Sequence, residues 1–311
     1  MTEPGVIDAG AWFGAFAERR IPWVVDDIAV RALAAGHGYR AIDVDAYDLS
    51  VPPASPVLFV PRRFATHDAL VEAWGETPAV VAHYSLARYD TPPAYAIERL
   101  LAVDFAATLA RRRALWAALD DAARVELHTA AGVLTAWFGE AVEAANPGDV
   151  LEPGGNPSIG EFFEAAIVNI EAPTSSFRAE GRLAFDAIGW LCNDDALADA
   201  TRALRDEWVA RAARGANVAT FEGGRLVELR LGGADATDAL HALCAGKERE
   251  TAANELGFGA RGADPAIDRA VNALIHKSGP GAYLGFGAGH LIPHVDLIAA
   301  DARVAWRGAD G

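Results

Sequence analysis

The chain has 311 residues and a formal net charge of −16 at pH 7, and 52% of its residues are hydrophobic. This length favours two compact domains over one, and the hydrophobic fraction is enough for both cores and argues against long disorder. The negative charge repels phosphate backbones and anionic lipid headgroups, so we expect neither nucleic acid nor a membrane as partner. A metal ion, a cationic group or the amine of a peptide suits this charge better.

Cysteine usage and the first residues indicate the compartment. Cys192 and Cys244 are the only cysteines and form no CxxC pair, which suits a reducing environment. Residues 1–10 have neither the basic nor the apolar segment of a secretory signal, and no stretch stays apolar long enough to span a bilayer. We therefore expect a cytoplasmic protein.

Residues 1–120 alternate between helical and strand patterns. Apolar residues recur at helical spacing over residues 11–35, with a break at Pro22, which has no N–H to donate. Short apolar stretches then predict strands, and helical patterns lie between and after them. The strands are expected at 39–47, 57–60 and 79–84, and the helices at 68–74 and 95–119. This alternation predicts an N-terminal α/β layered domain.

Residues 121–311 begin with strand patterns and continue with mixed ones. In chain order we expect strands at 124–127 and 133–138, helical or mixed structure at 179–192 and 195–214, a hairpin at 218–231 turning at Gly223-Gly224, and a helix at 235–244. The sequence therefore predicts a C-terminal domain of mixed α/β structure.

Four segments of the C-terminal half carry a family resemblance. They are Asn156-Pro-Ser-Ile-Gly-Glu-Phe-Phe-Glu-Ala, then Phe221-Glu-Gly-Gly-Arg-Leu-Val-Glu, then Asn254-Glu-Leu-Gly-Phe-Gly, and finally Lys277 to Gly287 followed by His294-Val-Asp296. In this order they resemble segments of the leucyl aminopeptidase T family of metallopeptidases, over about residues 150–300. The resemblance implies a two-domain aminopeptidase T-like architecture, with the metal site in the C-terminal domain.

The resemblance also implies a ligand set. Glu161 and Glu255 would be the catalytic carboxylates and, with His294 and Asp296, the metal ligands. Residues two apart on a strand point to the same face, so His294 and Asp296 can reach one ion. In the peptidases such a set holds two divalent metals that activate water and polarise the scissile carbonyl. The resemblance therefore implies a bound Zn, Mn or Fe ion. The family's habit of forming dimers also implies a homodimer.

One position departs from the family pattern. Tyr283 stands where the family carries a metal-binding histidine, and a phenol is a poor ligand for Zn²⁺ at neutral pH. The segment between Gly287 and His294 is also shorter than in the family. His276 or His290 could supply the histidine from another backbone position. Alternatively, the polar residues form a buried cluster without any metal, and the protein has no cofactor.

Three functions remain open on this basis. The favoured one is a peptide-binding protein that keeps the aminopeptidase scaffold with a degraded metal site, resembling proteins that guide precursor peptides in ribosomal peptide natural-product pathways such as that of the crocagins. Tyr283, His276 and His290 would then line the peptide site. The second is an active metallo-aminopeptidase that uses a reduced ligand set. The third is a mononuclear Fe(II) ring-cleaving dioxygenase, resembling another branch of the superfamily.

Overall fold

The computed structural model describes residues 5–48, 50–51, 53–74, 77, 79–84, 92–247 and 249–308. The chain divides into two compact units: Met1–Ala110 with Gly148–Phe163, and Arg111–Pro147 with Glu164–Gly311. Both contain helices and sheets, so the predicted mixed α/β class is confirmed. The domain boundary expected near residue 120 stays a prediction. Within the described ranges, no helix is long and apolar enough to cross a membrane.

The first unit is built on a parallel sheet with the strand order β3-β2-β4-β5. The strands are β2 (Trp23–Val25), β3 (Ala41–Asp43), β4 (Val57–Val60) and β5 (Val81–His83). Its helices are α1 (Ala9–Ala17), α2 (Ile28–Gly36), α3 (Phe64–Trp74), α4 (Pro93–Leu101), the start of α5 (Phe105–Asp120) and the 3-10 helices η1 (Val44–Ala46) and η3 (Ile159–Phe163). A short strand β1 (Ile7–Asp8) pairs with β9 (Val150–Leu151).

Two helix predictions in this unit need correction. The helical spacing over residues 11–35 hides strand β2, because three consecutive apolar residues fit a buried strand as well as one face of a helix. Helix α2 begins only after Asp27, whose side chain accepts hydrogen bonds from two backbone N–H groups of its first turn. The single helix expected at 95–119 is two helices, and the second begins after Asp104, which caps the N–H of Ala107 at 3.0 Å.

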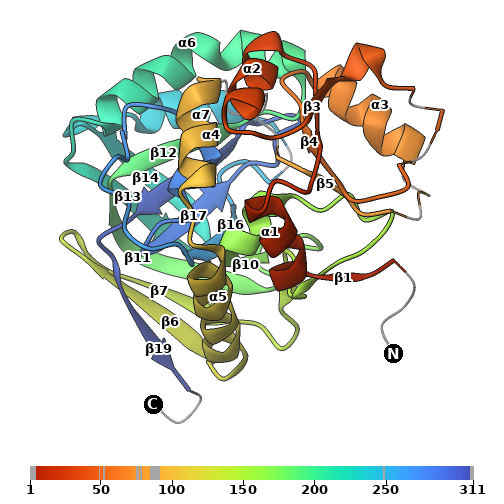
Figure 1. The fold of residues 1–311 in the computed structure, drawn as a ribbon. Helices are drawn as coiled ribbons and strands as arrows, with labels where there is room; N and C mark the ends of the chain where they lie inside the picture. The colour runs from red at the N-terminus through yellow and green to blue at the C-terminus, as the bar shows by residue number, and fades with distance from the viewer. Residues whose placement is uncertain are drawn as a thin grey trace. The chain divides into compact units, whose positions relative to one another are not determined.

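The second unit contains two antiparallel sheets, with the strand orders β15-β14-β13-β11-β7-β6-β19 and β12-β18-β17-β16-β10-β8 (Figure 1). The seven-stranded sheet consists of β6 (Arg124–Thr129), β7 (Gly132–Phe138), β11 (Phe177–Phe185), β13 (Asn217–Glu222), β14 (Arg225–Leu231), β15 (Ala234–Asp235) and β19 (Arg303–Arg307). The six-stranded sheet consists of β8 (Glu143–Ala144), β10 (Glu164–Val168), β12 (Ala187–Leu191), β16 (Ala253–Gly259), β17 (Ala282–Phe286) and β18 (His294–Ala299).

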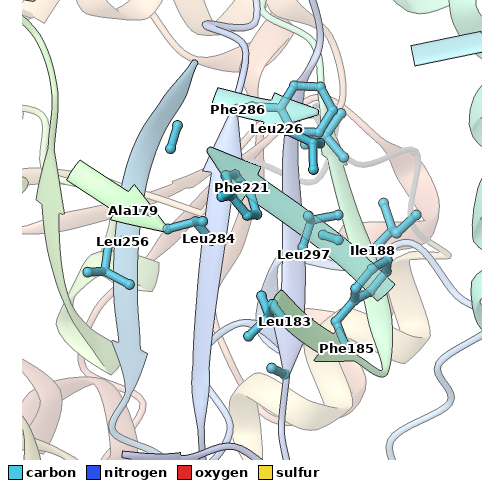
Figure 2. Packing of buried hydrophobic residues seen from close by; sticks show 14 of the residues in the cluster. Ala179, Leu183, Phe185, Ile188, Phe221, Leu226, Leu256, Leu284, Phe286 and Leu297 are labelled. Carbon is cyan, nitrogen blue, oxygen red and sulfur yellow. The ribbon is translucent and has the colours of Figure 1, made fainter. Parts of the chain in front are cut away.

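One hydrophobic cluster joins the two sheets of this unit. Figure 2 shows buried side chains of both sheets packed together, among them Phe221 from the seven-stranded sheet and Leu256, Leu284 and Leu297 from the six-stranded one. Helices α6 (Asp195–Ala212) and α7 (Thr237–Cys244) add buried residues to the same cluster. This core fixes which face of the six-stranded sheet is left for polar residues.

The predicted hairpin is confirmed as β13 and β14, in which Glu222 pairs with Arg225 across the turn. The helical or mixed pattern expected at 179–192 is wrong, because this stretch belongs to β11 and β12. In β11, Ala179, Leu183 and Phe185 are buried while Arg178 and Arg182 are exposed, which is strand alternation. Gly181 interrupts that alternation with a glycine in the middle of the strand.

Candidate functional site

Polar side chains gather on the face of the six-stranded sheet that is turned away from the hydrophobic core. Glu255 comes from β16, Tyr283 from β17, and His294 and Asp296 from β18, while the residues next to them on these strands belong to the core. His294 and Asp296 lie on one face, as the sequence predicts, and His294 Nε2 is 2.9 Å from Asp296 Oδ1. Three adjacent strands therefore bring these groups together.

Two glycines leave the room that these side chains occupy. A Cβ atom at Gly257, which pairs with Tyr283, would lie 2.1 Å from Cζ of the tyrosine ring. A Cβ atom at Gly285 would lie 2.9 Å from Asp296 Oδ1 and 2.9 Å from His294 Cε1. Real Cβ atoms do not approach this closely, so a larger residue at either position would have to displace these side chains.

The imidazole of His294 stands between two carboxylates. Its Nδ1 lies 2.9 Å from the carbonyl oxygen of Gly287, which can only accept, so Nδ1 carries a hydrogen. Its Nε2 lies 2.9 Å from Asp296 Oδ1 and 3.0 Å from Glu255 Oε2. Two anionic oxygens facing a bare ring nitrogen would repel it, so a proton or a metal ion belongs between them.

A bulge in β16 shapes the same corner of the site. The register with β17 shifts between Ala253 and Glu255, and the extra residue is Asn254. The Asn254 amide donates a hydrogen bond to the carbonyl oxygen of Gly287 and lies 3.4 Å from His294 Nδ1. The bulge thus places the amide against the same carbonyl oxygen that accepts from His294 Nδ1.

The ammonium group of Lys277 lies among the other carboxylate oxygens. Its Nζ is 3.0 Å from Glu255 Oε1, 3.3 Å from Glu164 Oε1 and 4.0 Å from Asp296 Oδ2. It also lies 4.7 Å from the centre of the Tyr283 ring, whose hydroxyl donates a 2.6 Å hydrogen bond to Glu255 Oε1. The carboxylates are therefore neutralised from within the chain.

Electrostatics keeps these groups charged despite their burial. Burial raises the pKa of Glu255, but Lys277 and His294 outweigh it and hold that pKa well below its usual range. Burial lowers the pKa of His294, but Asp296 and Glu255 raise it to about 10. Burial also lowers the pKa of Lys277, and Glu164 and Glu255 raise it well above its usual value. At neutral pH the site therefore holds the His294 imidazolium, the Lys277 ammonium and the ionised Glu255 carboxylate.

The donor set fits one divalent metal ion. One ligand atom each from Glu255, His294 and Asp296 lie within 4.8 Å of one another, and the His294 Nδ1–H is held by a carbonyl, as is usual for metal-binding histidines. An ion bound there would displace the Nε2 proton and polarise a substrate oxygen. A second ion does not fit the arrangement, because the Lys277 ammonium already lies beside the remaining carboxylate oxygens.

The other residues singled out by the sequence lie as follows. Tyr283 is fully buried and contacts Glu255 rather than standing free as a ligand. His276 is buried at the end of the 3-10 helix η4 (Leu274–His276), and His290 is exposed in the turn before β18. Glu161 lies in η3, in the first unit. The metal and peptide roles expected for Glu161, His276 and His290 stay predictions.

Three residues of the cluster were missed by the sequence reasoning. Glu164 lies three residues after Glu161 in the same segment, and the family resemblance pointed only to Glu161. Lys277 carried a signal that was available, because the chain has only two lysines, Lys247 and Lys277. No sequence pattern pointed to Asn254, because its place in the site depends on a β-bulge.

Comparisons with known proteins agree with this fold. A family model described as crocagin biosynthetic protein CgnE/B matches residues 18–307. No curated protein matches the sequence. Seven solved chains match. The 2,5-dihydroxypyridine dioxygenase of Pseudomonas putida KT2440 is 12% identical with a TM-score of 0.50, over 96% of this chain and 94% of the dioxygenase. AmpT of Thermus thermophilus is 15% identical with a TM-score of 0.46, over 94% and 91%. At 12% identity the dioxygenase shares the fold, and its reaction does not transfer.

Proposed function

The chain belongs to the crocagin biosynthetic protein CgnE/B family, and from that premise we propose that it is a peptide-binding protein that guides a precursor peptide in the biosynthesis of a ribosomal peptide natural product. The observation that carries the proposal is the position of Lys277 among Glu164, Glu255 and Asp296. A two-metal peptidase needs those carboxylates for its ions, whereas a binding protein has no such need. The peptide partner and the expected homodimer are parts of this proposal.

The open face of the seven-stranded sheet supplies a surface for the peptide. Its outward positions carry seven arginines against four glutamates and Asp235, so this face is net positive on a chain of net charge −16. They are Arg124, Arg178, Arg182, Arg225, Arg230, Arg303 and Arg307, with Glu126, Glu180, Glu222 and Glu228. Charge complementarity therefore favours an acidic peptide segment as the occupant. We call this surface the arginine face.

An aromatic side chain lies within the arginine face. Strand pairing places Arg307 opposite Arg124, Arg124 opposite Trp137, and Trp137 opposite Arg178, which makes one row across four strands. Trp137 is 39% exposed, and the Arg178 guanidinium lies 5.5 Å from the centre of its ring. Tryptophan and arginine are the residues most often responsible for binding energy at interfaces.

Not every arginine of this face is held by a carboxylate. Glu126 pairs with Arg307 at 2.9 Å and with Arg124 at 3.8 Å, and Glu180 pairs with Arg178 at 3.8 Å. Arg182 and Arg303 are exposed and have no carboxylate partner among the described residues. These two guanidinium groups are available to bind acidic side chains bidentately.

Fluorescence anisotropy tests the proposal. The probe is a fluorescein-labelled peptide of about a dozen residues, rich in Asp and Glu and containing two Leu, and its matched control has Lys in place of every acidic residue. We expect the acidic peptide to bind, the basic one not to bind, and Trp137→Ala and Arg178→Glu each to weaken binding about tenfold, which is about 1.4 kcal/mol. Ile170→Ala and Arg214→Glu are the matched surface controls, because both side chains are exposed and lie outside the arginine face.

Two results overturn the proposal. One is equal binding of the acidic and basic peptides up to millimolar concentration, or binding of neither. The other is unchanged affinity in both Trp137→Ala and Arg178→Glu, which removes the arginine face as the binding surface. Raising the salt concentration should weaken the acidic peptide's binding, since charge pairing on an exposed surface is screened.

A mononuclear metal enzyme is the second candidate, because Glu255, His294 and Asp296 converge on one point. One carboxylate with His294 and Asp296 leaves coordination positions open for O₂, so Fe(II) oxygen chemistry is the form to test first. Oxygen consumption with dihydroxypyridines after anaerobic loading with Fe(II), lost in His294→Ala, supports this candidate. The aminopeptidase alternative is tested by release of N-terminal residues from short peptides with Zn²⁺ or Mn²⁺, with Glu255→Ala as control.

A further inference from the structure

We propose that the ammonium group of Lys277 is a tethered cation in the place of one divalent ion, so that the cluster accepts at most one metal ion until this lysine is removed. The inference shares the position of Lys277 with the proposed function, but its test counts metal ions and does not depend on peptide binding. It starts from the pattern of contacts around Glu255 and Asp296. Each of these two carboxylates faces a different cation with each of its oxygens.

The carboxylate oxygens face two cation positions, one at the Lys277 ammonium and one at the His294 ring. Glu255 turns Oε1 to the Lys277 ammonium at 3.0 Å and Oε2 to the His294 ring nitrogen at 3.0 Å. Asp296 turns Oδ2 to Lys277 at 4.0 Å and Oδ1 to His294 at 2.9 Å. Carboxylates that bridge two cations in this way are the usual arrangement of sites with two metal ions. Here the Lys277 side chain occupies one cation position. The other position has the three donor atoms of a single metal site.

The choice of lysine at this position is informative. Of the 27 lysines and arginines of the chain, only Lys247 and Lys277 are lysines. An ammonium is a compact point charge that fits among three converging oxygens, whereas a planar guanidinium would need more room. The Lys277 side chain is 11% exposed and packs over the Tyr283 ring, so the charge is held inside the structure.

Removing Lys277 would take away the positive charge that lies beside these carboxylate oxygens. The Asp296 side chain is 1% exposed, and a buried carboxylate that loses a counter-charge is strongly destabilised. Asp296 Oδ2 accepts no hydrogen bond from the described residues, so a lone pair is directed into this space. A divalent ion supplies the missing charge with the oxygen ligands it prefers.

Metal stoichiometry tests the inference. Wild type, Lys277→Ser and Lys247→Ser are stripped with EDTA, incubated with Mn²⁺ or Zn²⁺, desalted, and analysed by inductively coupled plasma mass spectrometry. We expect no more than one ion per chain in the wild type and in Lys247→Ser, and one additional ion in Lys277→Ser. Added Mn²⁺ is expected to raise the midpoint temperature of thermal unfolding of Lys277→Ser by several degrees, which is more than in the wild type.

A companion variant and a metal-free measurement keep the test decisive if Lys277→Ser folds poorly. Lys277→Ser combined with Glu164→Gln removes one charge of each sign and should fold while still gaining an ion. In Lys247→Ser labelled with ¹⁵N-lysine, the sole remaining lysine ammonium should exchange its hydrogens slowly, because it is buried and hydrogen-bonded. Two ions in the wild type, an unchanged count in the folded Lys277 variants, or an ammonium that exchanges as fast as free lysine each overturn the inference.

Discussion

The hydroxyl group of Tyr283 donates a 2.6 Å hydrogen bond to Glu255 Oε1 inside the cluster. Because the ring is fully buried, Tyr283→Phe removes a donor to a charged acceptor without changing the shape of the core. We expect this variant to lose about 2 kcal/mol in the free energy of unfolding, measured by urea denaturation. Tyr47→Phe is the control, since its hydroxyl makes no hydrogen bond among the described residues and its loss should be near zero. Equal losses in the two variants would contradict the assignment.

Stability should depend on pH through His294. The pKa of this histidine is raised from 6.5 to about 10, so the folded state holds a proton that the unfolded state releases near pH 6.5. Its stabilisation is complete below about pH 6.5 and is lost as the pH rises toward 10. We expect the free energy of unfolding to fall between pH 7 and pH 9.5, and the fall to be smaller in His294→Gln. His128→Gln, on the exposed sheet face, should keep the wild-type slope, and a fall of the same size in His294→Gln would refute the prediction.

Gly257 and Tyr283 should be energetically coupled. A methyl group at position 257 would overlap the tyrosine ring, and we expect Gly257→Ala to cost about 1–3 kcal/mol in the free energy of unfolding. In a Tyr283→Ala background the ring is absent, so the same substitution should cost much less. Gly14→Ala in helix α1 is the control, because no atom lies within 4 Å and alanine favours a helix by about 0.5–1 kcal/mol. Additive losses at 257 and 283 would argue against the contact.

The two cysteines should be unreactive in the folded protein. Burial raises the pKa of the Cys244 thiol to about 11 and also raises that of Cys192. At pH 8 about one Cys244 thiol in a thousand is ionised, and alkylation requires the thiolate. Mass spectrometry after treatment with iodoacetamide should therefore find little adduct in the native protein and two adducts per chain in guanidinium chloride. Rapid labelling of the native protein is the contrary outcome.

Local patterns in the sequence predicted the elements whose signals do not depend on distant contacts. The hairpin turning at Gly223-Gly224 follows from a turn within a few residues, and both it and the helix expected at 235–244 are present. Strand β2 and strand β11 were misread, because short apolar runs and a strand interrupted by glycine have no clear period. Long-range pairing with neighbouring strands decides their structure, and that pairing is not visible in the local pattern.

The candidate site was predictable where it rests on one strand. The His-x-Asp spacing alone places His294 and Asp296 on a common face. The roles of Lys277 and Glu164 depend on how the loop after η4 and strand β10 reach this face, which no spacing reveals. Asn254 depends on a register shift between two strands, so the sequence could give no sign of it.

The overlap between a Cβ atom at position 257 and the Tyr283 ring also restricts the order in which this site can evolve. A lineage can replace Gly257 by a larger residue only after the tyrosine has been exchanged for a small side chain. A lineage that keeps the tyrosine is confined to glycine at position 257. Relatives of this chain should therefore divide into those that have Gly257 together with Tyr283 and those that have lost the tyrosine, and the pair of a larger residue with tyrosine should be missing.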